Sequence, residues 1–310
     1  MKFTLKTATC CVTASAALLI AASAGAAATT NTAACWVETA SSTIDAAMGG
    51  AGIRRTTEWR STISSVLVRR PQGDVLIDTG FGPDAETQMG ELPEPNRDFG
   101  LMILHGSKNR MPLVAALAQV NEAPDQIKRI IVTHAHYDHL GGATTLSAPI
   151  YLAAAEATWL AQQSAQPTIA PPSLIASLRG RFRSVDYASG PFLGFERSQD
   201  LYGDGTVVLV PLPGHTPGSQ GVFIELGGRY VFLIGDVSDL LEAATDGLPK
   251  NPVIRANTDT DAALADAQAK RVARFHQDYP DIAIVPAHDR DAFVAVFGAA
   301  PGCISAYAVK

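Results

Sequence analysis

The stretch VTHAHYDHLGG, residues 132–142, places three histidines and an aspartate within six residues, in a chain with seven histidines in all. The four residues are His134, His136, Asp138 and His139. Imidazole and carboxylate groups are preferred ligands of Zn²⁺ and similar ions. His134 and His136 can face the same side of an extended chain, whereas Asp138 and His139 can face another side across a bend. The motif therefore predicts two neighbouring half-sites for metal on one loop.

Two pairs of ligands do not complete two metal sites, so the chain must supply more. Three further candidates each follow a predicted strand and a turn: His215 in PLPGHTPGS, Asp236 in FLIGDVSD and His288 in VPAHD. Five of the seven histidines thus fall in one structural context. The alternatives are ordinary polar loop residues, a mononuclear site, and a non-catalytic protein that stores or carries metal. The complete set of ligand types favours a dinuclear catalytic site.

Short strands with helices between them must position these residues. β-Branched and apolar runs bounded by turn residues predict the strands, and Gly227-Gly228 predicts a hairpin between two of them. The predicted strands are 65–68, 75–77, 128–132, 206–210, 221–225, 230–234 and 282–285. Helical spacing predicts helices over 113–120, 153–162 and 260–277. Residues 82–111 and 163–205 are predicted to be long irregular loops. Strands in blocks, each followed by helices, predict a layered α/β fold.

The amino terminus has the pattern of a secretory signal peptide. Lys2 and Lys6 precede an apolar run and then small residues with A-x-A sites, so we assign residues 1–26 to a signal and expect a periplasmic or secreted protein. Residues 27–310 are expected to form a single hydrolase domain. No later apolar run reaches membrane-spanning length, so no membrane association is expected after signal removal.

The bulk composition argues against one class of partner and bears on the redox state of the cysteines. The formal charge of −6 becomes −8 without Lys2 and Lys6, and there is no Lys/Arg cluster, which argues against nucleic acid as a partner. Cys35 and Cys303 remain after signal removal. In an oxidising compartment they can pair or stay free, and the sequence leaves both open. Oligomeric state is not predicted.

The motifs THAHYDHLGG, GHTPGS, GDVSD and PAHD, with the earlier LIDTGFG (76–82), resemble the metallo-β-lactamase superfamily of dinuclear metallohydrolases over about residues 62–290. The resemblance implies a four-layer αββα sandwich with the active site along one edge of its paired sheets. It also implies that the metal ligands are distributed between two ions. Those ligands are His134, His136 and His215 for the first ion, Asp138, His139 and His288 for the second, and Asp236 bridging both.

The resemblance further implies supporting and chemical roles. Asp78 matches a family aspartate that supports the metal-bearing loops, although the residues alone suggest only a turn aspartate. Two divalent ions, expected to be Zn²⁺, would hold a bridging hydroxide that attacks a carbonyl or phosphoryl centre. Asp138 or Asp236 would relay the proton to the leaving group. No serine nucleophile is required, so Ser219 and Ser238 are interpreted as loop residues.

The substrate is expected to be a small molecule, and the residues beside the ligands indicate its class. True metallo-β-lactamases lack the bridging aspartate, so Asp236 favours the lactonase, glyoxalase-type and phosphotriesterase-type branches. Acyl-homoserine lactonases carry a tyrosine three residues later, where this chain has Asp239. A lactone or ester is the favoured substrate, and a phosphotriester or a β-lactam is the alternative.

Two further side chains have two interpretations each, and a third has one. Tyr137 is predicted to line the pocket, with core packing as the alternative. His105 either overhangs the site or is a solvated loop residue. His276 is expected at the surface, near the end of a polar helix.

Overall fold

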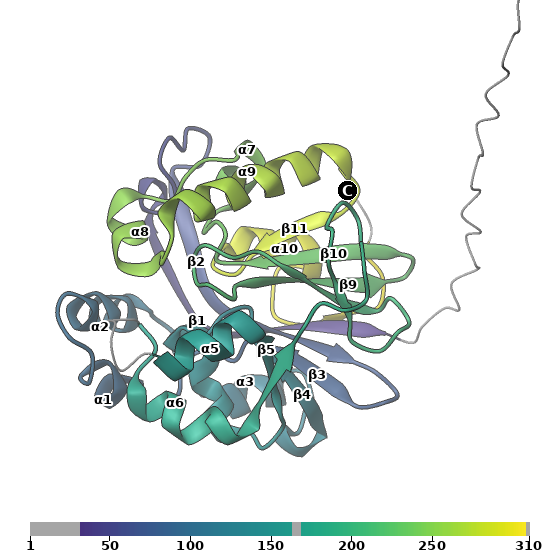
Figure 1. Ribbon diagram of the computed structural model, residues 1–310, viewed down its shortest axis with the longest axis horizontal. Helices are drawn as coiled ribbons and strands as arrows, with labels where there is room; N and C mark the ends of the chain where they lie inside the picture. Colours follow the sequence, from purple (N-terminus) through teal and green to yellow (C-terminus); the bar gives the residue numbers. More distant parts are fainter. Residues whose placement is uncertain (1–31, 163–168, 308–310) are drawn as a thin grey trace, which may run out of the picture.

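Two facing β-sheets with helices on both outer sides make up the molecule (Figure 1). The computed structural model describes residues 32–162 and 169–307, so the signal segment assigned to 1–26 lies outside the described residues. One sheet has seven strands in the order β12-β1-β2-β3-β4-β5-β6, and the other has five in the order β11-β10-β9-β8-β7. The predicted four-layer αββα sandwich is confirmed.

The strands of both sheets include every strand that the sequence predicts. The first sheet contains β1 (Ala33–Asp45), β2 (Glu58–Arg69), β3 (Asp74–Ile77), β4 (Ile127–Ile131), β5 (Ile150–Ala153), β6 (Phe182–Val185) and β12 (Cys303–Ile304). The second contains β7 (Gln199–Asp200), β8 (Val207–Pro211), β9 (Gln220–Leu226), β10 (Arg229–Gly235) and β11 (Ala283–Pro286). Strands β3 to β6 run parallel, as do β10 and β11.

The helices lie outside the sheets, with α9 along one outer side and α3, α5 and α6 along the other (Figure 1). Their bounds are α1 (Ala85–Met89), α2 (Asn96–Gly106), α3 (Leu113–Gln119), α4 (Tyr137–Leu140), α5 (Ala154–Gln162), α6 (Pro172–Leu178), α7 (Leu241–Asp246), α8 (Pro252–Thr258), α9 (Ala262–Asp278) and α10 (Arg290–Phe297). The helices predicted near 113–120, 153–162 and 260–277 correspond to α3, α5 and α9.

Alternating residues along the strands contribute their side chains to separate hydrophobic layers. In β2, Val66 and Val68 point between the sheets while Leu67 packs under the helices outside the first sheet. In β8, Leu209 points between the sheets while its two neighbours pack under α9. This period of two is the expected pleat of a strand buried on both faces. Three apolar layers between four structural layers thus hold the strand ends in fixed relative positions.

The two segments predicted to be irregular contain regular structure, so that prediction was wrong. Residues 82–111 contain α1 and α2, and the described part of 163–205 contains α6, β6 and β7. Proline misled the interpretation, because it is tolerated where a helix begins. Pro95 immediately precedes α2, and Pro172 is the first residue of α6.

Cys35 and Cys303 form a disulfide, which the sequence left open. They are register partners on the adjacent strands β1 and β12, so the bond ties the two ends of the described chain together.

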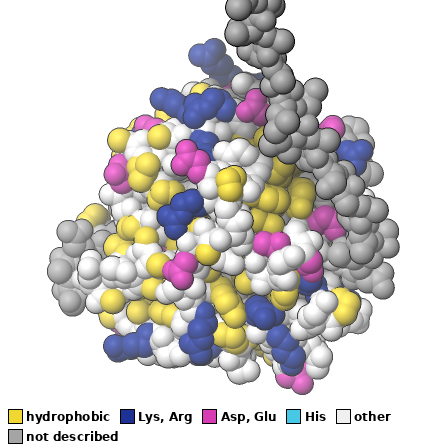
Figure 2. All heavy atoms as spheres, turned by 45° about the vertical axis from the view of Figure 1, so that its right-hand side comes forward, with side chains coloured by type: hydrophobic (Ala, Val, Ile, Leu, Met, Phe, Trp, Pro, Cys, Tyr) yellow, Lys and Arg dark blue, Asp and Glu magenta, His cyan; other side chains and the backbone are white. Residues whose placement is uncertain are grey.

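No helix among the described residues is long and apolar enough to cross a membrane. Among the coloured side chains on the face shown in Figure 2, basic and acidic groups are interspersed.

Candidate metal centre

The predicted ligands meet at one edge of the paired sheets because the strands before them end there. Gly235 of β10 and Pro286 of β11 are register partners in a parallel pair, so Asp236 and His288 leave the sheet side by side. Strand β4 leads into the loop that carries His134 and His136, and that loop continues into α4. His215 arrives from the loop after β8.

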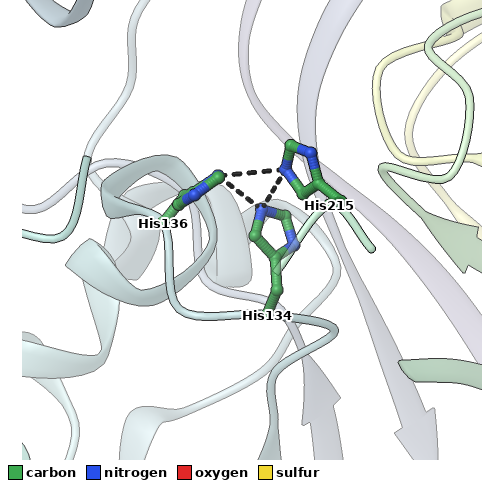
Figure 3. A group of neighbouring side chains, drawn as sticks. All are labelled: His134, His136 and His215. Atoms are coloured by element: carbon green, nitrogen blue, oxygen red, sulfur yellow. Dashed lines mark hydrogen bonds between the residues drawn. The ribbon is translucent and has the colours of Figure 1, made fainter. Parts of the chain in front are cut away.

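Three histidine rings form the first cluster, His134, His136 and His215, and point at one another (Figure 3). His134 Nε2 lies 3.0 Å from His136 Nδ1 and 3.1 Å from His215 Nε2, and the latter two nitrogens are 3.0 Å apart. All three side chains are buried. Burial, together with the neighbouring cationic groups, lowers the pKa of each, and for His134 and His136 well below the usual range. The lowered pKa values favour the neutral imidazoles that metal binding requires.

The second cluster consists of Asp138, His139 and His288, whose ligand atoms all lie within 4.8 Å of one another. His139 Nε2 is 3.3 Å from His288 Nε2, and Asp138 Oδ2 is 3.6 Å from the same nitrogen. Burial lowers the pKa of His288, but Asp236 and Asp138 outweigh it and raise that pKa to about 9. The same kind of balance raises the pKa of His139 well above its usual range.

The carboxylate of Asp236 lies between the two clusters. Its Oδ2 is 3.4 Å from His215 Nε2 and 3.2 Å from His288 Nε2, and its Oδ1 is 3.4 Å from His139 Nε2. Burial raises its pKa, but the adjacent histidines outweigh burial and lower it well below the usual range. One carboxylate thus faces both clusters, as the bridging role implied by the resemblance requires.

Three of the histidines are oriented by an acceptor on the ring nitrogen that faces away from the clusters. His139 Nδ1 donates to Asp78 Oδ2 at 2.9 Å, and His215 Nδ1 donates to Asp259 Oδ1 at 2.8 Å. His288 Nδ1 donates to the carbonyl oxygen of Thr62 at 2.9 Å. With Nδ1 bonded in this way, each Nε2 faces the cluster and is the nitrogen that would bind a metal, which is the usual arrangement of metal-binding histidines.

The residues fit a pair of divalent ions. Asp236 Oδ1 is buried without a well-aligned hydrogen bond, and the group it faces at 3.4 Å, His139 Nε2, is itself a metal-type ligand. Nitrogens 3.0–3.1 Å apart can all reach one ion at about 2.0–2.1 Å, the usual Zn–N distance. Histidine and carboxylate donors without cysteine suit Zn²⁺ and also other divalent ions of the first transition row.

Asp78 joins the two segments that lead into the site. Its Oδ1 accepts the backbone N–H of Thr133 at 2.7 Å, and its Oδ2 accepts the Thr133 hydroxyl at 2.8 Å in addition to His139 Nδ1. Asp78 is 4% exposed and directly follows β3, which runs parallel to β4. The structure therefore places it where a residue that supports the ligand loop must lie.

A pocket of about 270 Å³ opens onto the clusters. Its floor includes His136, Asp138, Asp236 and His288. Its walls are mostly apolar and come from β1, β2, α2 and α8 together with the segments beside them: Ile44, Met48, Trp59, Ile63, Phe99, Met102, Ile103, Ile169 and Ile254. The site thus combines metal-type polar side chains at one end of the pocket with mostly apolar walls.

Tyr137 takes both of the roles that the sequence left open. It lines the pocket and is also packed in the core, where it is 2% exposed and stacks on Phe81. Its hydroxyl donates to the backbone carbonyl of Gly100 in α2 at 3.1 Å. That bond connects α4, which carries Asp138, to the helix that forms one wall of the pocket.

Four charged residues near the site were missed by sequence reasoning or left without a role. Lys250 is buried, with its Nζ 3.1 Å from Asp259 Oδ1 and 2.7 Å from His215 Nδ1, so it contacts both members of the His215–Asp259 pair. Asp239, which departs in sequence from the acyl-homoserine lactonase pattern, lines the pocket, and burial raises its pKa to about 6. Burial also raises the pKa of Glu156 to about 7, against hydrogen bonds that lower it.

The other singled-out residues lie outside the clusters. His105 is exposed on α2 and pairs with Glu86 at 2.9 Å, so it does not overhang the pocket. His276 is partly buried near the end of α9 rather than fully at the surface. Ser219 bonds within its own loop, to the N–H and hydroxyl of Thr216. Ser238 is buried, with a hydroxyl that has no hydrogen-bond partner.

Residues 59–288 match the Metallo-beta-lactamase superfamily. The chain belongs to that superfamily. A probable metallo-hydrolase of Mycobacterium tuberculosis is 32% identical over 249 residues, which is 74% of each chain. An N-acyl homoserine lactonase of Bacillus cereus is 28% identical over 185 residues, covering 59% of this chain and 66% of that one. Membership confirms the expectation of a hydrolase.

Solved structures share the fold of this superfamily member. An N-acyl homoserine lactone hydrolase, with the product N-hexanoyl-L-homoserine bound at its catalytic metal centre, aligns with a TM-score of 0.60 and 21% identity. That alignment covers 85% of this chain and 95% of the other. The dizinc lactonase AidC aligns with a TM-score of 0.60 and 16% identity, over 84% and 88% of the two chains.

Proposed function

We propose that the protein is a dinuclear zinc hydrolase that opens lactones or cleaves esters carrying an apolar chain. The observation that carries the proposal is the joining of a buried histidine and carboxylate cluster to an apolar pocket. His134, His136 and His215 would hold one ion, Asp138, His139 and His288 the other, and Asp236 both.

Two divalent ions at this place would lower the pKa of a coordinated water towards neutrality and stabilise negative charge on the substrate carbonyl oxygen. The chain's own residues supply the rest. The carboxylates of Asp138 and Asp236 form part of the pocket floor, so either can take a proton and pass it to the leaving oxygen. The apolar walls exclude bulk water, which strengthens the electrostatic interactions at the floor.

The pocket walls support the choice of substrate. They offer apolar surface from several elements, and Met102 and Ile44 at the wall are partly exposed, at 51% and 39%. An apolar substituent next to a scissile carbonyl would be desolvated there. The similarity to proteins named as N-acyl homoserine lactonases points to the same class of substrate.

The experiment is a substrate panel with the purified, zinc-loaded protein. We would measure turnover of an acyl-homoserine lactone, an aryl ester, a phosphotriester and a chromogenic cephalosporin, each with and without a chelator. We expect lactone or ester turnover that chelation abolishes and zinc restores. Elemental analysis should give about two ions per chain, as expected for a two-metal site.

A matched pair of histidine variants controls for general damage. His288→Ala should lose turnover and one metal equivalent, whereas His105→Ala, at an exposed residue outside the pocket, should keep both. Turnover that survives complete metal removal would refute the mechanism. Fast cephalosporin or phosphotriester cleavage without lactone or ester turnover would refute the substrate class.

We also propose that the protein is exported, as the amino-terminal pattern of residues 1–26 predicts. The disulfide between Cys35 and Cys303 supports this proposal, because disulfides persist in oxidising compartments. Fractionation of the producing cell and mass measurement of the mature chain test it. A cytosolic product that retains residues 1–26 would contradict it.

A further inference from the structure

Glu156 is a fully buried carboxylate that has no role in the chemistry proposed above. It lies in the first turn of α5, and its side chain is 0% exposed. A lone carboxylate at such a place is strongly destabilising unless hydrogen-bond donors meet it. The donors that do meet it identify its role.

The two carboxylate oxygens of Glu156 bind two different ligand-bearing loops. Oε1 accepts the backbone N–H of Ala135 at 2.8 Å, and Ala135 stands between His134 and His136. Oε2 accepts the backbone N–H of Gly218 at 2.9 Å, in the loop that carries His215. One side chain therefore links the two loops that supply the first cluster.

Glycine at position 218 makes this link possible, because it has no side chain. A Cβ atom at Gly218 would lie 2.3 Å from the backbone nitrogen of Glu156 and 2.7 Å from its Cα. Those distances are far inside van der Waals contact, so the loop of His215 lies directly on the start of α5. A shift of α5 would consequently move both loops.

We propose that Glu156 is a positioning residue that fixes the separation of the two loops and thereby pre-forms the His134, His136 and His215 site. The three ring nitrogens lie 3.0–3.1 Å apart although His136 and His215 are 79 residues apart in the chain. Glu156 connects their loops through backbone groups, so it sets the geometry without touching a ligand. This inference rests on the proposed function, because the site has to hold a metal for its geometry to matter.

The test compares Glu156→Gln with Glu242→Gln. Glutamine keeps the size of the side chain but turns one acceptor oxygen into a donor that faces a backbone N–H. Glu242 is the matched control: it is 7% exposed and accepts the backbone N–H groups of residues 54–56, none of which belongs to the ligand loops. Zinc affinity is measured by competition with a chromophoric chelator, and unfolding of the metal-free proteins by urea titration.

We expect Glu156→Gln to weaken zinc binding about 10- to 100-fold, the usual effect of losing a group that orients ligands. Glu242→Gln should lower the stability of the metal-free protein and leave zinc affinity unchanged. Wild-type affinity in Glu156→Gln would overturn the positioning role and leave the metal site standing. A wild-type protein without zinc affinity would overturn both, which keeps the two failures distinguishable.

A measurement on the wild-type protein covers the case in which Glu156→Gln does not fold. Hydrogen exchange at the amides of Ala135 and Gly218 should be slow, because each donates to a buried carboxylate oxygen. The backbone amide of Gln72, in the exposed turn that follows β2, provides the fast reference. Exchange of the Ala135 and Gly218 amides at the rate of that turn would overturn the proposal.

Discussion

Substitution of Asp78 by asparagine should weaken both the fold and the metal site. The carboxylate accepts three hydrogen bonds, two from Thr133 and one from His139. Asparagine retains one oxygen, so its amide nitrogen must face either the Thr133 N–H or the His139 Nδ1–H as a second donor. The backbone of residue 78 has φ 56°, a left-handed conformation that asparagine tolerates, so the change tests the carboxylate and leaves the backbone unstrained.

The magnitude follows from the bonds that are lost. A hydrogen bond to a charged group contributes about 1.5–3 kcal/mol, and a buried donor left without an acceptor costs about 1–3 kcal/mol. At least one bond is lost and one donor is left unmet, so we expect the free energy of unfolding to fall by about 2.5–6 kcal/mol. Zinc affinity should fall about 10- to 100-fold, because His139 loses the acceptor that orients its ring.

Urea unfolding of the metal-free proteins measures the first effect, and chelator competition measures the second. Asp45→Asn is the control. Asp45 also accepts a backbone N–H, at 2.8 Å from Ala47, but it caps an exposed turn where asparagine serves equally well. Wild-type stability and wild-type zinc affinity in Asp78→Asn would refute the reasoning.

Three further outcomes can be measured separately. Replacing Cys35 and Cys303 by serine should lower the free energy of unfolding by about 2–5 kcal/mol, and the doubly substituted protein should no longer respond to reductant. Burial raises the pKa of Glu242, but backbone N–H groups outweigh it and lower that pKa to about 2. Its stabilisation is therefore present above about pH 4.3 and lost as the pH falls towards 2, so Glu242→Gln should flatten acid unfolding over that range. Met102→Ser should raise KM for long-chain esters about two- to fivefold and leave kcat for short-chain esters unchanged, as kinetics on a chain-length series would show.

The predicted ligands come together because their signal is local. A metal-type residue just after a strand is visible in a single sequence, and strand ends of a layered α/β fold gather at one edge. Asp236 and His288 illustrate this, since they follow register partners of a parallel strand pair. Their meeting requires only that β10 and β11 be adjacent.

The residues that support the ligands have no comparable signal. Glu156 binds Gly218 across 62 residues, and Asp259 binds His215 across 44. Lys250 reaches the carboxylate of Asp259 from the irregular segment between α7 and α8, which has no recognisable motif. Each is an ordinary charged residue until the chain is folded, so their roles depend on long-range packing that periodicity and spacing do not encode.

The glycine pair that ends the opening motif shows how such packing changes an interpretation. Gly141 and Gly142 suggest a sharp change of direction, yet Gly141 has φ −60° and ψ −43°, a helical conformation that any residue adopts. Space is the constraint instead: a Cβ at Gly142 would lie 2.1 Å from the carbonyl oxygen of Thr79, and one at Gly141 would lie 2.5 Å from the nitrogen of Gly82. LIDTGFG and DHLGG are therefore two sides of one backbone contact. That contact brings the chain at Asp78 close enough for its carboxylate to accept a hydrogen bond from His139. The two glycines therefore affect the metal centre by allowing Asp78 to orient His139, and their effect on the turn itself is secondary.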